Sequence, residues 1–190
     1  MKSRVIALSA VAAGFVALFL TLGAYVSFID IFSVIIASVF VVLPMYLDSL
    51  LGSVLAFLAG GVIAFLLGGA NIFSLVWPSY LLFFGILPIL NFIVAKKNFN
   101  KTAWFIIKLV WFLAVCAFLV FYYTAVMHLP VEYVFSIFGK EFDFSHVAGI
   151  EIIFYAVFGV LCVVFFLVYN QFVRLSQAYV NRVLARIIKK

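Results

Sequence analysis

Charged residues are scarce in this chain of 190 residues, of which Asp, Glu, Lys and Arg together make up only 9%. A soluble domain carries roughly 25% charged residues, and about half of its residues are apolar. Here 69% of the residues are hydrophobic, and the mean hydropathy is +1.39. The chain lacks the polar surface that a water-soluble globule needs, so we expect an integral membrane protein.

Cysteine is also nearly absent, and the motifs of common enzyme classes are missing. Cys116 and Cys162 lie in apolar stretches without the spacing of a disulfide framework or a metal site, so we interpret them as small buried hydrophobes. The HExxH, GxSxG and P-loop patterns do not occur. Asp30 and Asp48 fall at the ends of apolar segments, which disfavours a paired-aspartate protease. We expect a non-enzyme without cofactor or metal, in which any energy for transport comes from a partner.

The chain has instead long apolar runs, such as VIALSAVAAGFVALFLTLGAYV near its start. Strands of a membrane barrel alternate apolar and polar residues, so these runs favour helices, which need about 20 residues to span. We interpret the first run as a retained membrane helix rather than a signal peptide. The sequence predicts an all-α polytopic membrane protein, with one domain over residues 1–190 and six transmembrane helices. These spans are expected at about residues 5–24, 31–43, 50–67, 79–95, 102–127 and 150–173, with a basic tail at 174–190.

Asp and Pro residues mark several of the predicted helix ends. Asp30 is expected to cap the second helix, and Pro44 to end it. Pro78 suits the first turn of the fourth helix. Pro88 lies inside that helix, where it is expected to produce a kink and to free a carbonyl near Phe84.

The basic residues are distributed unevenly along the chain, and this predicts its orientation. If the amino terminus is cytoplasmic, ten of the twelve Lys and Arg residues fall on the cytoplasmic side, Lys140 falls outside, and Lys108 lies within a span. The ten are Lys2, Arg4, Lys96, Lys97, Lys101, Arg174, Arg182, Arg186, Lys189 and Lys190. We therefore expect cytoplasmic termini and a multi-pass protein of the cell membrane. The net charge of +6 then comes from basic residues that face the cytoplasm and the anionic headgroups of the lipid bilayer. We expect no binding of nucleic acid.

Three polar residues fall in or at the edge of the predicted spans, where such groups are costly. Lys108 lies near the cytoplasmic interface and either snorkels to it or has a buried partner. Asn91 is expected to form a hydrogen bond between helices near the inner side. Glu151 begins the sixth span at the outer face, where it either caps the helix or contacts a ligand.

Aromatic and polar residues gather near the predicted outer face of the membrane. A pocket for a small organic ligand combines apolar and aromatic walls with a few polar groups, but an interfacial aromatic belt has a similar composition. Both interpretations stay open at this point. The candidate substrate-binding residues are Tyr25, Asn71, Trp77, Ser79, Tyr122, Tyr123 and Glu151, with His128 nearby.

Small residues recur at helical spacing in the first and third spans, which allows close approach of another helix. That helix belongs either to this bundle, which the spacing favours, or to a partner protein. In the first span the small residues are Ser9, Ala10, Ala13, Gly14 and Ala17. In the third span they are Gly52, Ala56, Gly60, Ala64 and Gly68, and internal packing is expected there.

Three stretches carry a resemblance to a known family. They are ALSAVAAGFVALF with Ala13 and Ala17, then IDIFSVIIASVFVVLP, and then the glycine-bearing DSLLGSVLAFLAGGVIAFLLGG. With the size and the number of spans, these stretches resemble the substrate-binding S components of energy-coupling factor (ECF) vitamin transporters. The resemblance implies a vitamin-like substrate bound near the outer face. It also implies a transmembrane coupling subunit, held by the small-residue face of the first helix, and a pair of cytoplasmic ATPases.

The size and the number of spans are also similar to those of the MreD rod-shape proteins. That resemblance implies a membrane scaffold of cell-shape or envelope assembly, without a small-molecule ligand.

Overall fold

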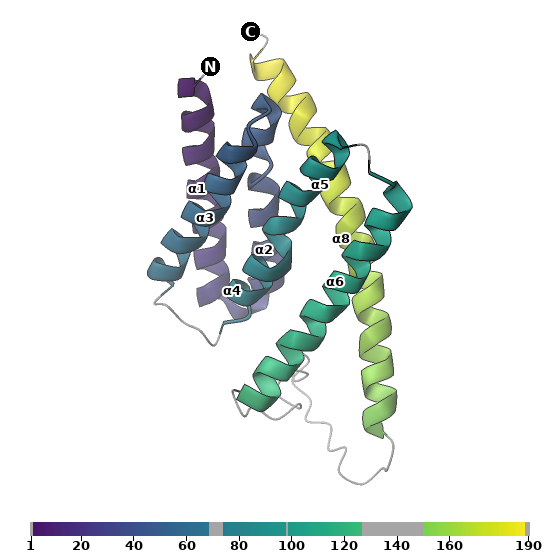
Figure 1. Ribbon diagram of the computed structural model, residues 1–190. Helices are drawn as coiled ribbons and strands as arrows, with labels where there is room; N and C mark the ends of the chain where they lie inside the picture. Colours follow the sequence, from purple (N-terminus) through teal and green to yellow (C-terminus); the bar gives the residue numbers. More distant parts are fainter. Residues whose placement is uncertain (1, 69–73, 98, 127–149, 189–190) are drawn as a thin grey trace. The chain divides into compact units, whose positions relative to one another are not determined.

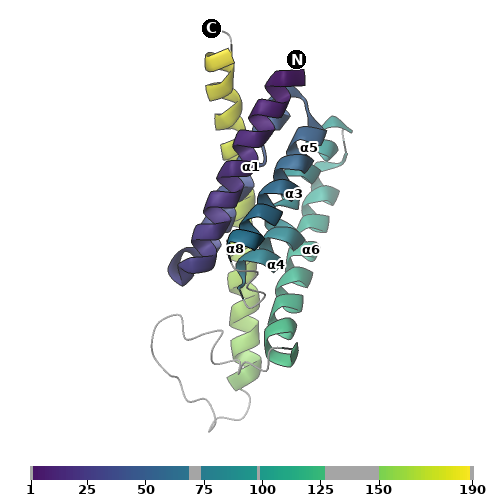
Figure 2. The ribbon, with the colours of Figure 1, turned by 90° about the vertical axis from the view of Figure 1, so that its left-hand side faces the viewer.

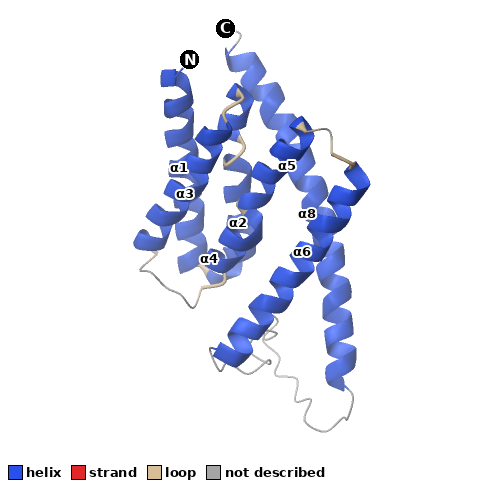
Figure 3. Ribbon diagram, viewed as in Figure 1, coloured by secondary structure: helices blue, strands red, loops and turns tan. Residues whose placement is uncertain are grey.

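The computed structural model describes residues 2–68, 74–97, 99–126 and 150–188 (Figure 1). Among these residues the regular structure is helical, and no strand occurs (Figure 3). Six helical segments are long and apolar enough to cross a membrane, which confirms the predicted all-α, six-helix fold of a multi-pass membrane protein. These segments are Ser3–Tyr25, Asp30–Leu47, Leu50–Leu67, Val76–Lys96, Lys101–Phe121 and Ala156–Val180.

The chain forms two compact units. Unit 1 comprises Met1–Trp104 and Tyr169–Lys190, and unit 2 comprises Phe105–Val168. The first four spans and the carboxyl-terminal part of the sixth therefore belong to unit 1. Most of the fifth span and the start of the sixth belong to unit 2.

The first three spans of unit 1 are joined by short turns. Helix α1 (Lys2–Tyr25) is followed by the 3-10 turn η1 (Ser27–Ile29) and by α2 (Asp30–Phe40). A second 3-10 segment, η2 (Leu43–Leu47), leads to α3 (Leu50–Leu67), the span whose predicted bounds agree with the structure.

Two expectations about the second span are corrected. The expectation that Asp30 caps α2 is wrong, because Ile29 occupies the capping position and no side chain caps the helix there. The expected end at Pro44 is also wrong: α2 ends at Phe40, and Pro44 lies at the start of η2. Proline suits the first positions of a helical segment because its missing N–H has no partner there. The second span is therefore continued by a 3-10 segment.

The fourth span has three parts. They are α4 (Val76–Ser79), the π-helical η3 (Tyr80–Phe84) and α5 (Ile86–Lys96). Pro78 lies in the first turn, as predicted. The π-helical part lies immediately before Pro88, where the sequence predicts a kink.

The fifth and sixth spans are α6 (Lys101–Phe121), extended by the π-helical η4 (Tyr122–Val126), and α8 (Ile150–Ile188). Asn100 caps the start of α6, because its Oδ1 accepts a hydrogen bond from the backbone N–H of Thr102 at 3.0 Å. The predicted end of the sixth helix at residue 173 is wrong. The basic segment continues the same helix to Ile188.

The core of unit 1 depends on close approach between α1 and α3, which lie side by side in Figures 1 and 2. A Cβ added at Gly60 of α3 would lie 2.6 Å from Val16 Cγ1 and 3.0 Å from the carbonyl oxygen of Ala13. A Cβ added at Gly52 would lie 2.6 Å from Ser9 Oγ. The small residues of the third span therefore pack internally, as expected.

In unit 2, aromatic side chains pack α6 against α8. The ring centroid of Phe112 lies 6.0 Å from that of Phe165 and 5.6 Å from that of Phe166. Cys162 is buried and Cys116 is half-buried, and both are free thiols. Their placement in the apolar contact between these helices agrees with their interpretation as small hydrophobes.

Candidate functional site

Four helix ends meet at one end of unit 1, opposite the chain termini, and we call this the distal end. It comprises the carboxyl ends of α1 and α3 and the amino ends of α2 and α4 (Figure 1). Tyr25 joins α1 to α3 there, because its hydroxyl donates to the carbonyl oxygen of Leu67 at 2.8 Å. Gly68 lies against α1 and α4, since a Cβ there would be 3.3 Å from both Ala24 Cβ and Trp77 Cζ2.

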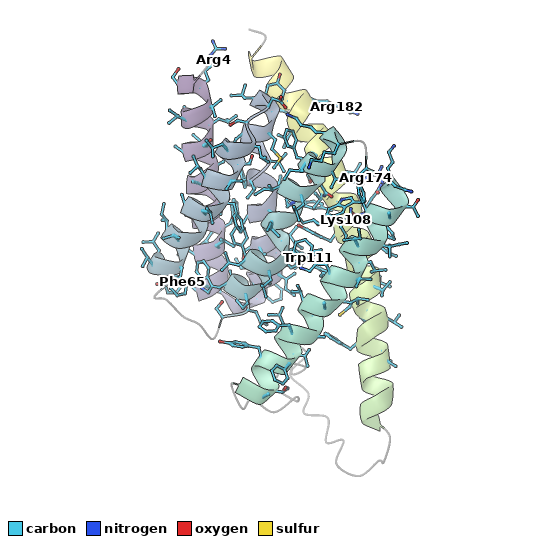
Figure 4. The ribbon with its side chains drawn as sticks, viewed as in Figure 1. Arg4, Phe65, Lys108, Trp111, Arg174 and Arg182 are labelled. Carbon is cyan, nitrogen blue, oxygen red and sulfur yellow. The ribbon has the colours of Figure 1, made fainter. Side chains whose placement is uncertain are left out.

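Trp77 has the largest side chain at the distal end, and only 5% of it is exposed. Its ring meets Phe65 edge to face, with 5.3 Å between the ring centroids. Figure 4 shows Phe65 toward this end, while Arg4 and Arg182 lie toward the end with the termini. The indole Nε1 of Trp77 is buried and has no hydrogen-bond partner among the described residues. A buried tryptophan N–H normally has a partner, so this donor is exceptional among the described residues.

Two further buried polar atoms near the distal end have no hydrogen-bond partner within the described part of the chain. They are Oγ1 of Thr21, in the last turn of α1, and Oδ1 of Asp30, the first residue of α2. Leaving such an atom unpaired costs about 1–3 kcal/mol. One donor, one hydroxyl and one carboxylate oxygen at the same end of a helical unit are suited to a small polar or amphipathic ligand.

The other candidate substrate-binding residues differ in placement. The hydroxyl of Ser79 donates to the carbonyl oxygen of Leu75 at 2.6 Å, within its own helix. Tyr122 belongs to unit 2, where its ring stacks on Phe118 with 6.3 Å between centroids. The structure thus gathers Tyr25, Trp77 and Ser79 at the distal end of unit 1. The side chains of Tyr123 and Glu151, and all of Asn71 and His128, lie outside the described residues.

The candidate partner-binding residues of α1 divide into two groups. Ser9, Ala13 and Ala17 are buried, and the contacts of Gly52 and Gly60 place this face against α3. This is the internal packing that the spacing favours. Ala10 and Gly14 are exposed on α1, and a Cβ added at Gly14 would meet nothing within 4 Å.

The two polar residues expected inside the spans have different outcomes. The hydrogen bond expected at Asn91 is confirmed, because Trp104 Nε1 of α6 donates to its Oδ1 at 2.9 Å. Lys108 is only 5% exposed, so of its two expected placements snorkelling is wrong and a buried partner stands. A snorkelling lysine keeps its ammonium group in water, which this burial excludes.

The end of unit 1 near the termini carries basic residues and, within the described ranges, an ion pair. Lys96 Nζ, at the end of α5, lies 2.6 Å from Asp48 Oδ1 in the turn before α3. Both side chains are exposed, so the pair contributes at most about 1 kcal/mol. It does place the Asp48 turn beside the end of α5, as the predicted topology requires.

A buried hydroxyl network lies between α2, η3 and α8, and sequence reasoning did not identify it. The Tyr169 hydroxyl is 3.2 Å from Ser38 Oγ and 3.3 Å from the carbonyl oxygen of Phe84. That carbonyl is the one that Pro88 was predicted to free. The signals in the sequence were Pro88, which cannot donate to this carbonyl, and a tyrosine and a serine inside apolar runs, but the pairing is long-range.

A scan of protein-family models and searches of curated proteins and of solved structures find no match to this chain. The function is therefore inferred from the residues of this chain. They form a six-span membrane protein with a basic end and a distal end, where buried polar atoms have no partner in the described part of the chain.

Proposed function

We propose that this chain is the membrane-embedded substrate-binding subunit of an ECF-type importer for a vitamin or a similar small organic micronutrient. Its partners are then a transmembrane coupling subunit and a pair of ATPases, since the sequence carries no nucleotide-binding motif of its own. The distal end faces outward and takes up the substrate, and the basic end faces the cytoplasm.

The observation that supports binding most directly is the buried indole N–H of Trp77 without a partner in the described structure. Thr21 and Asp30 add an unpaired hydroxyl and an unpaired carboxylate oxygen near the same end. A purely structural bundle gains nothing from such atoms, because each lowers its stability. A ligand with a hydrogen-bond acceptor for the indole N–H offsets that cost on binding.

The division of α1 gives the proposal a specific coupling surface. Ser9 and Ala13 pack against α3 and Ala17 is buried, so a coupling subunit has access to Ala10 and Gly14 instead. These two residues lie four apart on one exposed face, where a second helix can approach closely.

Native mass spectrometry of the purified protein against a panel of vitamins tests this function. We expect a bound molecule of vitamin size, with an affinity about tenfold lower in Trp77→Phe, which keeps a ring but removes the donor. Trp104→Phe is the matched control. It also removes an indole N–H, but that N–H bonds Asn91 rather than facing the distal end.

The MreD-like scaffold makes the opposite prediction. It gives a spectrum free of any small ligand, and pull-down from cells recovers proteins of cell-wall assembly. Equal binding by Trp77→Phe and the unmodified protein would remove Trp77 from the site and leave the binding function in place.

A further inference from the structure

Unit 2 brings its two cysteines together in the contact between α6 and α8. The thiols of Cys116 and Cys162 are hydrogen-bonded to one another. The two helices run in opposite directions (Figure 1), and Phe112 packs on Phe166 with 5.6 Å between the ring centroids. Cys116 lies four residues after Phe112, and Cys162 lies four residues before Phe166, so each cysteine shares a helix face with its phenylalanine. The register of the aromatic contact therefore agrees with the contact between the thiols.

The cysteine pair lies at the edge of the tight contact between these helices. On one side of the pair are the packed rings of Phe112 and Phe166. On the other side the apolar side chains are more exposed, with exposed fractions of 61% for Phe121 and 53% for Val157. A Cβ added at Gly159 would meet nothing within 4 Å. A covalent bond between the cysteines would therefore hold the helices together where their packing becomes looser.

The surroundings of the pair determine which reagents reach it. Cys116 lies in the span Lys101–Phe121 and Cys162 in the span Ala156–Val180, and Cys162 is only 8% exposed. Reagents that dissolve in the apolar part of a membrane or micelle reach such thiols more readily than reagents confined to water. Thiols exchange with disulfides through a mixed-disulfide intermediate, and a second thiol nearby resolves that intermediate. The sulfur atoms approach to about 2.0 Å as the new bond forms.

We propose that Cys116 and Cys162 form a reversible modification site, at which a small apolar disulfide oxidises the pair to a disulfide that joins α6 to α8. The sulfur of one cysteine attacks the reagent, forms a mixed disulfide and releases one thiol. The other cysteine then attacks the mixed disulfide and releases the second thiol. Two S–H bonds of the protein and the S–S bond of the reagent break, while one S–S bond in the protein and two S–H bonds in the released thiols form. The site does not depend on the proposed substrate or on a coupling subunit.

The full-length protein in detergent micelles, treated with one equivalent of 2,2′-dithiodipyridine, tests this site. The reagent is an apolar disulfide, and each exchange step releases one thiopyridone, which is measured by its absorbance. We expect two thiopyridones per chain, and an intact mass that shows the loss of two hydrogen atoms and no bound pyridyl group. The unfolding temperature should rise by about 5 °C or more, because the bond constrains the unfolded chain, and a reductant should reverse the rise.

Three variants separate bond formation within the pair from the reactivity of a single thiol. Cys116→Ser and Cys162→Ser each keep one thiol, so each should release one thiopyridone and keep one bound pyridyl group. Cys116→Ser combined with Ala117→Cys keeps two thiols, but it moves one of them by about 100° around α6 to an exposed position. We expect this register control to carry a bound pyridyl group and to form no internal disulfide.

Three results would overturn the proposal. Pyridyl groups that stay bound to the unmodified protein would show that the thiols react but do not reach one another. Thiols that react only after denaturation would show that the pair contributes packing alone. An internal disulfide that forms equally fast in the register control would show that the bond follows from helix motion and not from the contact between Cys116 and Cys162.

Discussion

At the residue scale, Gly60 shows how one missing Cβ fixes the distance between two helices. Val16 and the Ala13 carbonyl oxygen occupy the space where a side chain would begin. We expect Gly60→Ala to destabilise the protein by about 1–3 kcal/mol, because overpacking forces the backbones of α1 and α3 apart. Thermal unfolding in detergent measures the change.

Gly14 provides the matched control on α1, since a Cβ there meets nothing within 4 Å. Alanine is the better helix former by up to about 1 kcal/mol, so Gly14→Ala should keep or raise the unfolding temperature. An equal fall in unfolding temperature for Gly60→Ala and Gly14→Ala would mean that the effect comes from the backbone conformation of glycine and not from the close approach of α1 and α3.

Residue-level predictions succeeded where one local rule decides the outcome. Pro88 must free the carbonyl of Phe84 whatever surrounds it, and an amide inside a span, such as Asn91, needs a partner. They failed where the surroundings decide. Asp30 missed the cap because the preceding 3-10 turn places Ile29 there, and Lys108 is buried although the interface is within its reach along the chain.

At the scale of one element, α1 has a packed face and an exposed face, and both faces carry small residues. Ala13 is buried against α3, and Ala10 is exposed. We therefore expect Ala13→Leu to lower the unfolding temperature and the yield of folded protein, whereas Ala10→Leu keeps both. Size-exclusion chromatography and thermal unfolding of the two variants side by side measure this.

The same pair separates packing from coupling. If the proposed coupling surface is correct, Ala10→Leu binds substrate normally but recovers less of the coupling subunit in pull-down. Normal recovery with Ala10→Leu would place the coupling surface elsewhere. A stable, folded Ala13→Leu would contradict the internal packing of that face.

Element ends were predictable only where the sequence contains a helix breaker. The third span agrees with its predicted bounds because Ser49 starts it, with its Oγ accepting from the Gly52 N–H at 3.1 Å, and Gly68 ends it. The sixth helix was predicted too short because its hydropathy falls after Val173. Residues 174–188 contain neither glycine nor proline, so nothing in the backbone ends the helix there.

At the scale of the whole chain, composition predicted the class of protein, and the positions of the apolar runs predicted the number of spans. Long apolar runs separated by Gly, Pro and charged residues leave little choice in a membrane. The candidate site was only partly predictable, because an aromatic belt and a pocket have the same composition. Only the structure distinguishes Trp77, whose buried N–H has no partner among the described residues, from Ser79, whose hydroxyl donates to the nearby carbonyl oxygens of Leu75 and Val76.

The orientation of the chain follows from charge and is open to a direct test. Two of the exposed basic residues, Lys96 and Lys97, end the fourth span, and the positive-inside rule places them in the cytoplasm. In a background with Cys116 and Cys162 replaced by serine, we expect Phe99→Cys to resist a membrane-impermeant thiol reagent in intact cells. Lys140→Cys should react in the same cells.

Permeabilised cells supply the control, because both single-cysteine variants should react there if both cysteines are accessible. Phe99 is 49% exposed, so protection in intact cells reflects the membrane and not burial. Labelling of Phe99→Cys from outside would show that the chain has the opposite orientation to the predicted one. It would also place Trp77 and the distal end of unit 1 on the cytoplasmic side, where an external substrate does not reach them before transport. The same measurement therefore decides whether the proposed uptake site faces the outside of the cell.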